Sequence, residues 1–172
     1  PILLLLVGGQ GSGKSWFCQH LMEYNTASTA SCDNARQWVH LSQDVLKRRE
    51  KVEQAATEAL KQGKNVVVDR MHLDATQRAH FISIGWGVGV ATHALVLTAP
   101  TRATLLHRVR TRTNHPGGVQ GESGAKMAAS SAQKLQFPKY SEGLGLISAA
   151  SLSSHVLQLA QQYANVIIDN GK

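Results

Sequence analysis

The sequence predicts an α/β fold in which a five-stranded, mainly parallel sheet is covered by helices on both faces and completed by a lid. Short aliphatic runs alternate along the chain with segments whose apolar residues recur at helical spacing. Strands that alternate with helices in this way form parallel sheets with both faces covered. The length of 172 residues suits one domain with one core, so we expect a single domain over residues 1–172.

The expected strands are short runs of aliphatic and β-branched residues. Residues 2–7 form an uninterrupted apolar run, which is too short to cross a bilayer and is typical of a buried central strand. Three consecutive valines precede Asp69 in a second run of this kind. The expected strands cover residues 2–7, 38–41, 65–69, 93–97 and 166–168.

The expected helices lie between these strands. Asp74 is a candidate N-cap and Gly63 a candidate C-cap. Helices are expected over residues 14–24, over 45–62, after Asp74, after Thr101 and around 156–163, with a connection over 25–37. The glycine-rich segment 113–150 breaks the alternation, although a weaker helix pattern lies near 125–135. A long segment without a strand pattern predicts a functional loop or lid.

A phosphate-binding loop of the form G-x-x-x-x-G-K-[ST] follows the first strand. It reads Gly8-Gly9-Gln10-Gly11-Ser12-Gly13-Lys14-Ser15. Its glycines let backbone N–H groups turn toward the β- and γ-phosphates, Lys14 adds a positive charge, and the Ser15 hydroxyl ligates Mg²⁺. The following helix offers its positive end to the same anion. The sequence therefore predicts binding of a nucleoside triphosphate, with ATP and Mg²⁺ as cofactors.

The charge balance indicates a large anionic partner. Lys and Arg number 18 and Asp and Glu 11, so the formal net charge is +7. This excess exceeds what one nucleotide needs and favours a nucleic acid over a small metabolite as the partner. We expect no membrane association, because no apolar segment is long enough to span a bilayer.

The two cysteines, Cys18 and Cys32, lack the spacing of metal ligands and are too few for a disulfide scaffold. We therefore expect two small buried residues, no zinc site, and an intracellular, reducing compartment, with nucleus and cytoplasm both open. The chain begins at Pro1 rather than Met, which we interpret as a fragment of a longer protein with neighbouring domains.

Two carboxylates follow expected strands and are candidates for chemistry. The carboxyl ends of parallel strands meet at one rim, so Asp44 and Asp69 are expected near the loop 8–15. Asp44 can accept a proton from a hydroxyl that attacks the γ-phosphate, or it can cap a helix beginning at Val45. Asp69 resembles a Walker-B carboxylate, which would hold Mg²⁺ through water or orient the acceptor.

Basic side chains are the second group of candidates. Arg108 and Arg112 are four residues apart on an expected helix, where both could clasp a polyphosphate; a solvated basic face is the alternative. Lys47 and Arg48 could contact the backbone of an acceptor or lie in solvent. Arg70 and His72 could touch a phosphate or a base, and a surface position is the alternative for His72.

On these residues the chain resembles the P-loop 5′-hydroxyl polynucleotide kinases of nucleic-acid end-healing enzymes, over about residues 3–113. The motifs are Gly8–Ser15, Ser42-Gln43-Asp44, Val66-Val67-Val68-Asp69-Arg70 with Gln77-Arg78, and Arg108-x-x-x-Arg112. Residues 69–78 and 113–117 are similar to the kinase module of plant and algal aprataxin-like proteins, and that similarity extends to Leu159.

The resemblance implies a role for each matching residue. Asp44 matches the general base, Lys14 and Ser15 the phosphate and Mg²⁺ contacts, and Arg108 and Arg112 the lid arginines. It also implies acceptor contacts by Asp44, Lys47, Arg48, Asp69, Arg70, His72 and Arg78. The chain departs from the family at Lys47, where an arginine is common, and at His72, where an asparagine is common.

The sequence therefore predicts a polynucleotide 5′-hydroxyl kinase that transfers the γ-phosphate of ATP to DNA or RNA ends in end repair. Two alternatives remain open. One is a P-loop kinase of small molecules such as sugars, which would need a closed acceptor pocket. The other is a module that binds nucleic-acid ends in a nucleotide-dependent way with little transfer.

Overall fold

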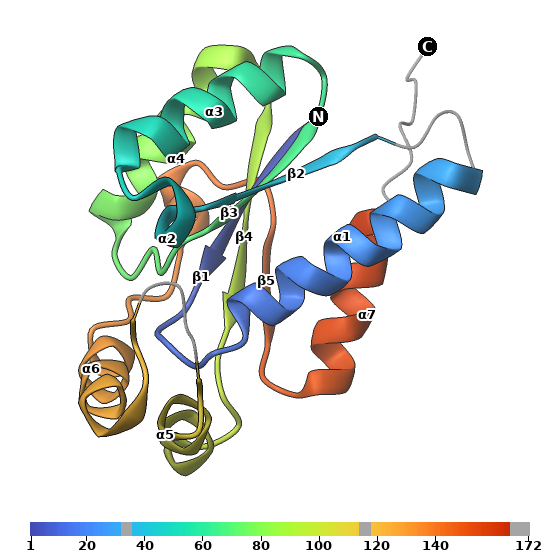
Figure 1. The fold of residues 1–172 in the computed structure, drawn as a ribbon. Helices are drawn as coiled ribbons and strands as arrows, with labels where there is room; N and C mark the ends of the chain where they lie inside the picture. Colours follow the sequence, from blue (N-terminus) through green and yellow to red (C-terminus); the bar gives the residue numbers. More distant parts are fainter. Residues whose placement is uncertain (32–35, 114–117, 166–172) are drawn as a thin grey trace.

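The computed structural model describes all residues except 32–35, 114–117 and 166–172. Its centre is a five-stranded sheet in the order β2-β3-β1-β4-β5, and every neighbouring pair of strands is parallel (Figure 1). The strands are β1 Ile2–Val7, β2 Trp38–Ser42, β3 Asn65–Asp69, β4 Ala91–Leu97 and β5 Ile147–Ala150. The predicted fold class, a helix-covered parallel sheet of five strands, is confirmed.

Helices cover both faces of this sheet. The helices are α1 Lys14–Ser31, α2 Gln43–Leu46, α3 Arg49–Lys61, α4 Ala75–Val88, α5 Arg102–Arg110, α6 Gly121–Gln133 and α7 Ser153–Ala164, with a 3₁₀ turn η1 at Tyr140–Glu142. Helices α3 and α4 lie against one face, α1 and α7 against the other, and α5 and α6 lie side by side near the carboxyl end of β1 (Figure 1).

The uninterrupted apolar run of β1 follows from its central position. Leu3 and Leu5 enter the core beneath α3 and α4, whereas Leu4 and Leu6 enter the core beneath α1 and α7. Side chains alternate across a strand, so a strand covered on both faces must be apolar at every position. All four leucines are fully buried, and so is Val7, which precedes the phosphate loop. The start of the loop is therefore anchored in the core.

Two of the expected helices differ clearly from the structure. Helix α1 continues to Ser31, into the expected connection 25–37, because the Asn25 side chain binds the start of β2: its Oδ1 accepts from Trp38 N and its Nδ2 donates to Arg36 O, both at 2.9 Å. The expected helix 45–62 is divided into α2 and α3, because Lys47 has a φ of +66°. Gly63 then ends α3 with a φ of +78°.

The fifth strand lies in the segment that was predicted to be a lid. Strand β5 pairs with β4 from Ala94 opposite Ile147, and Gly145 N donates to Thr92 O at 2.9 Å just before it. Its short, small-residue sequence carries no β-branched run, so its pattern was too weak to recognise. The strand expected at residues 166–168 lies outside the described residues.

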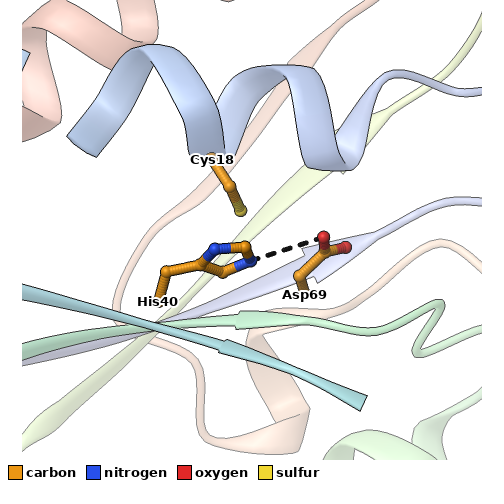
Figure 2. Close-up of side chains that lie close together, drawn as sticks. All are labelled: Cys18, His40 and Asp69. Atoms are coloured by element: carbon orange, nitrogen blue, oxygen red, sulfur yellow. Dashed lines mark ion pairs between the residues drawn. The ribbon is translucent and has the colours of Figure 1, made fainter. Parts of the chain in front are cut away.

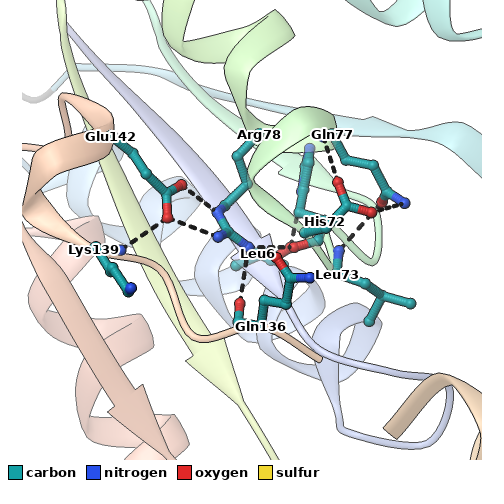
Figure 3. Close-up of polar contacts among 9 residues, drawn as sticks. Leu6, His72, Leu73, Gln77, Arg78, Gln136, Lys139 and Glu142 are labelled. Carbon is teal, nitrogen blue, oxygen red and sulfur yellow. Dashed lines mark hydrogen bonds and ion pairs between the residues drawn. The ribbon is translucent and has the colours of Figure 1, made fainter. Parts of the chain in front are cut away.

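A buried arginine joins three segments behind the phosphate loop (Figure 3). Arg78, on α4, is fully buried and holds both oxygens of Glu142, with Nε at 2.7 Å and Nη2 at 2.8 Å. Its Nη1 donates to the carbonyls of His72 and Gln136, each at 3.0 Å. Residues 136–142 are therefore fixed to α4 and to the turn after β3.

We predict that Glu142→Gln lowers the free energy of unfolding by about 3 kcal/mol, because it leaves the buried Arg78 charge without its partner. Hydrogen bonding from Arg78 holds the pKa of Glu142 below its ordinary value of 4.5. The stabilisation is therefore complete above pH 4.5 and lost as the pH falls through the folded pKa, so the two proteins should converge in acid. Urea unfolding at a series of pH values measures both effects.

The matched control is Glu122→Gln, which removes the partner of Arg110 in an exposed pair. Its unfolding midpoint should equal that of the wild type. Equal destabilisation by the two variants would contradict a special role for the buried pair.

Candidate nucleotide and phosphoryl-transfer site

A cavity of about 720 Å³ opens beside the phosphate loop. Most of the predicted site residues line it: Gln10, Gly11, Ser12, Gly13, Lys14, Ser15, Asp44, Asp69, Arg70, Arg108 and Arg112. They come from the loop after β1, the ends of β2 and β3, and the segment containing α5. The cavity lies beyond the carboxyl ends of the strands, which is where open parallel sheets bind their ligands.

The phosphate loop depends on glycine at its first position. A side chain at Gly8 would collide with the Leu97 carbonyl, and Gly8 N donates to Met71 O at 2.9 Å. The loop therefore begins pressed between β4 and the turn after β3. Gly9 also borders a second cavity of about 250 Å³, which extends toward α5 and α6.

The ammonium of Lys14 folds back onto the loop. Its Nζ donates to Gly8 O and to Gly9 O, both at 2.8 Å. Burial lowers the pKa of Lys14 to about 8, against the opposing attraction of the Asp69 carboxylate. A bound phosphate would supply a negative charge that balances this ammonium, which is the arrangement expected of an anion site.

Ser15 and Asp69 present hard oxygen ligands side by side. Ser15 Oγ donates to Asp69 Oδ2 at 2.9 Å, and both residues line the cavity. Burial raises the pKa of Asp69, but hydrogen bonds from His40 and Ser15 and the charge of Lys14 outweigh it, so the pKa lies below its usual range. An ionised carboxylate and a hydroxyl are ligands that suit Mg²⁺.

Asp44 lies on another side of the cavity, in the first turn of α2. The helix begins at Gln43, so Asp44 does not take the capping position that was its alternative role; Ser42 occupies that position without a capping hydrogen bond from its side chain. The Asp44 carboxylate is exposed and lines the cavity. It is therefore accessible to a hydroxyl that enters from solvent.

The two predicted arginines approach this cavity from the segment containing α5. Arg108 Nη1 makes a long hydrogen bond of 3.4 Å to Gly11 O, while Arg112 lies just beyond the end of the helix. Partial burial lowers the pKa of Arg112, and attraction to Asp44 and Asp69 opposes the shift. Arg110 instead pairs with Glu122 in solvent, at 2.7 Å.

Helix α6 supports the same region from outside. Ser131 donates from its hydroxyl to the side-chain oxygen of Gln10, and Ala128 packs with Leu105 and Val109 of α5. A side chain at Gly11 would press on Val109. The predicted lid segment therefore contacts the phosphate loop directly.

Four of the residues predicted to contact the acceptor do not line the cavity. The predicted contacts by His72 and Arg78 are wrong for this structure, because both side chains are fully buried. His72 Nδ1 donates to Leu6 O at 2.9 Å, and burial lowers its pKa to about 3, so the ring is neutral. Lys47 and Arg48 are exposed at the junction of α2 and α3. They remain candidates for a longer ligand.

Sequence reasoning missed part of the cavity wall. Ser151, Ser153 and Val156, which follow β5, line it, as do Trp16 and Gln77. The first three could have been predicted from their position directly after a strand, but β5 was not recognised in the sequence. Gln77 directly precedes the motif residue Arg78 in the sequence, and no ligand contact was predicted for it.

The fold and the site define the class of protein. A phosphate loop between β1 and α1, a hydrogen-bonded serine–aspartate pair beside it and arginines on an adjoining segment are the parts of a P-loop kinase-like domain. A family model described as "AAA domain" (AAA_33) matches residues 3–140, so the chain belongs to that family.

The chain is also similar to a curated protein and to solved structures of other proteins. The chain is 35% identical over 151 residues to "Transcription factor bHLH140" of Arabidopsis thaliana; the match covers 85% of this chain but 15% of that protein. Kti12 of Chaetomium thermophilum, solved with ADP-AlF3, has a TM-score of 0.69 at 12% identity, covering 96% of this chain and 99% of Kti12. Mycobacterium tuberculosis APS kinase CysC, solved with AMPPNP and APS, has a TM-score of 0.63 at 16% identity, covering 93% of each chain.

The structural similarities, at these identities, show the fold alone. No helix among the described residues is both long and apolar enough to cross a membrane.

We predict that nucleotide affinity falls about tenfold per pH unit above pH 8, because only the protonated form of Lys14 attracts phosphate. ATP is fully ionised in this range, so its own charge stays constant. Calorimetric titration with ATP between pH 7 and pH 9.5 measures the slope. In Lys14→Met, binding should be weak and independent of pH, and equal slopes in both proteins would contradict this role of Lys14.

Proposed function

We propose that this domain is a polynucleotide 5′-hydroxyl kinase that transfers the γ-phosphate of ATP to the 5′-OH end of DNA or RNA in end repair. The observation that carries the proposal is the position of Asp44. Its carboxylate lines the same cavity as Lys14 and Arg112 and is open to solvent. An acceptor hydroxyl can therefore approach the γ-phosphate with a base beside it.

The reaction needs one proton transfer and one displacement. Asp44 accepts the proton of the 5′-hydroxyl while the new oxygen–phosphorus bond forms, and ADP leaves with the electrons of the broken bond. Lys14, Arg108 and Arg112 balance the negative charge that spreads over the transferring group. Mg²⁺, held by Ser15 and Asp69, would add its positive charge to the β- and γ-phosphates.

A nucleic-acid acceptor is supported by the net charge and by the positions of basic side chains. The net charge of +7 favours a polyanion, and Lys47 and Arg48 are exposed directly after Asp44 in the chain. Arg70 lines the cavity on the Asp69 side and can take an acceptor phosphate. Because the chain spans 15% of its Arabidopsis relative, we further propose that the module works beside other domains.

Two other functions are compatible with the same fold. APS kinase, a solved kinase of a small molecule, shares the architecture, so a small acceptor is the main alternative. A module that binds ends without transfer would need the cations but not the Asp44 base. The three functions are distinguished by which molecule, if any, receives the label.

We predict that Asp44→Asn slows transfer from γ-labelled ATP to a 5′-OH oligonucleotide by about 10²–10⁴-fold, because the base is lost. The affinity for ATP should change little, since Asp44 does not belong to the phosphate loop. The matched control is Glu50→Gln, an exposed carboxylate on α3 that does not line the cavity. It should transfer at the wild-type rate.

The outcomes separate the three functions. Label that appears on sugars or other small alcohols but not on the oligonucleotide would support the small-molecule kinase. Salt-sensitive binding of the oligonucleotide without any labelled product would support the binding module. Either result would overturn the proposal.

We predict that Arg112→Ala lowers the maximal transfer rate by about 10²–10³-fold, because a positive charge near the transferring phosphate is removed. Arg110→Ala is the matched control: it removes an arginine two residues away whose side chain is paired with Glu122 in solvent. Steady-state kinetics at saturating ATP measure both variants. Equal losses in the two variants would assign the effect to the general basic surface and not to Arg112.

A further inference from the structure

We propose that Cys18, His40 and Asp69 form a metal site, selective for zinc-like transition metals, that shares Asp69 with the Ser15–Asp69 pair (Figure 2). The three residues come from α1, β2 and β3. They are distant in sequence, so the expectation of no zinc site, which used cysteine spacing alone, did not anticipate them. Within the described parts of the chain, no other cluster of three such side chains was found.

The distances are close to those of a bound ion. The three ligand atoms all lie within 4.8 Å of one another, and His40 Nε2 is 3.5 Å from Asp69 Oδ2. Tetrahedral zinc with bonds of about 2.0–2.3 Å requires ligand atoms about 3.3–3.6 Å apart. The histidine–aspartate pair already meets this requirement, and the thiol needs to approach by about 1 Å.

The ligand types select against magnesium. Sulfur and imidazole nitrogen favour Zn²⁺ and Co²⁺, whereas Mg²⁺ prefers oxygen ligands in an octahedron. Cys18 is fully buried, with its thiol directed toward the other two side chains (Figure 2). The His40 side chain is 31% exposed, which gives an ion a route from solvent. Three protein ligands leave the fourth position to water.

Binding would involve no redox change. The Cys18 thiol releases its proton to solvent as the sulfur–metal bond forms, and His40 binds as a neutral ring through one nitrogen. Asp69 is ionised already. The ion would therefore replace one thiol proton and would lie between His40 and Asp69 in place of their direct contact.

The consequence is competition for Asp69. Its Oδ2 accepts the Ser15 hydroxyl at 2.9 Å, and the same oxygen is the one nearest His40. A transition metal that draws this carboxylate toward His40 and Cys18 would withdraw it from the magnesium position. Zinc would thereby inhibit nucleotide-dependent transfer; this consequence, unlike binding itself, rests on the proposed function.

The direct test is titration of the nucleotide-free, untagged chain with Co²⁺ followed by absorbance. A cobalt–thiolate bond gives a near-ultraviolet charge-transfer band, and tetrahedral geometry gives intense visible bands. We expect both in the wild type, with stoichiometric loss on addition of Zn²⁺. Cys18→Ser should abolish the charge-transfer band, and His40→Gln should weaken binding at least about tenfold, since even loss of an outer-shell partner has an effect of that size.

Matched controls exclude other thiols and histidines. Cys32→Ser removes the other cysteine of the chain, and His155→Gln removes an exposed histidine on α7. Both should bind Co²⁺ like the wild type. His40 is partly exposed, so its variant should fold even if the substitution of buried Cys18 disturbs the core, and circular dichroism checks this. A missing charge-transfer band in the wild type, or one that survives in folded Cys18→Ser, would overturn the site.

A second readout separates this inference from the proposed function. Zn²⁺ should inhibit label transfer by the wild type, a chelator should restore it, and Cys18→Ser should need at least about tenfold more Zn²⁺. The cobalt bands without any transfer would contradict the kinase but support the site. Transfer without the bands would contradict the site but support the kinase.

Discussion

The site depends on one partly buried positive charge at the start of α1. Lys14 lies among backbone groups of the loop that it belongs to, with Gly8 O and Gly9 O as its hydrogen-bond acceptors. Two neutral carbonyls do not balance the charge of an ammonium, and burial lowers the pKa of Lys14 to about 8 against the attraction of Asp69. The loop is therefore incomplete without an anion, and a triphosphate restores both charge and hydrogen bonds.

The remaining fold holds that charge in place. Strand β1 is buried on both faces and can move little, and the loop that follows it is tied to Met71 through Gly8 N. His72, held by Leu6, and Arg78, held by Glu142, stiffen the turn on the other side of the loop. These side chains were expected to contact a ligand; in the structure they instead hold the backbone beside the cavity.

What the sequence could predict followed from local pattern. The phosphate loop, the strand before it and the Asp74 cap, which accepts from Gln77 N at 2.8 Å, are all encoded within a few neighbouring residues. The site roles proposed for Asp44 and Arg112 stay predictions, although both line the expected cavity. The features that could not be predicted depend on residues that are distant in sequence. Strand β5 is defined by its pairing with β4, and the buried Arg78 is paired with Glu142, 64 residues away.

The most direct measurement is a crystal structure with Mg²⁺, a non-hydrolysable ATP analogue and a short 5′-OH oligonucleotide. The account predicts the triphosphate in the loop at Lys14, the Arg112 guanidinium near the terminal phosphate, and an Asp44 oxygen within hydrogen-bond distance of the 5′-hydroxyl. An Asp44 side chain turned away from the terminal phosphorus, with no room for a hydroxyl between them, would contradict it.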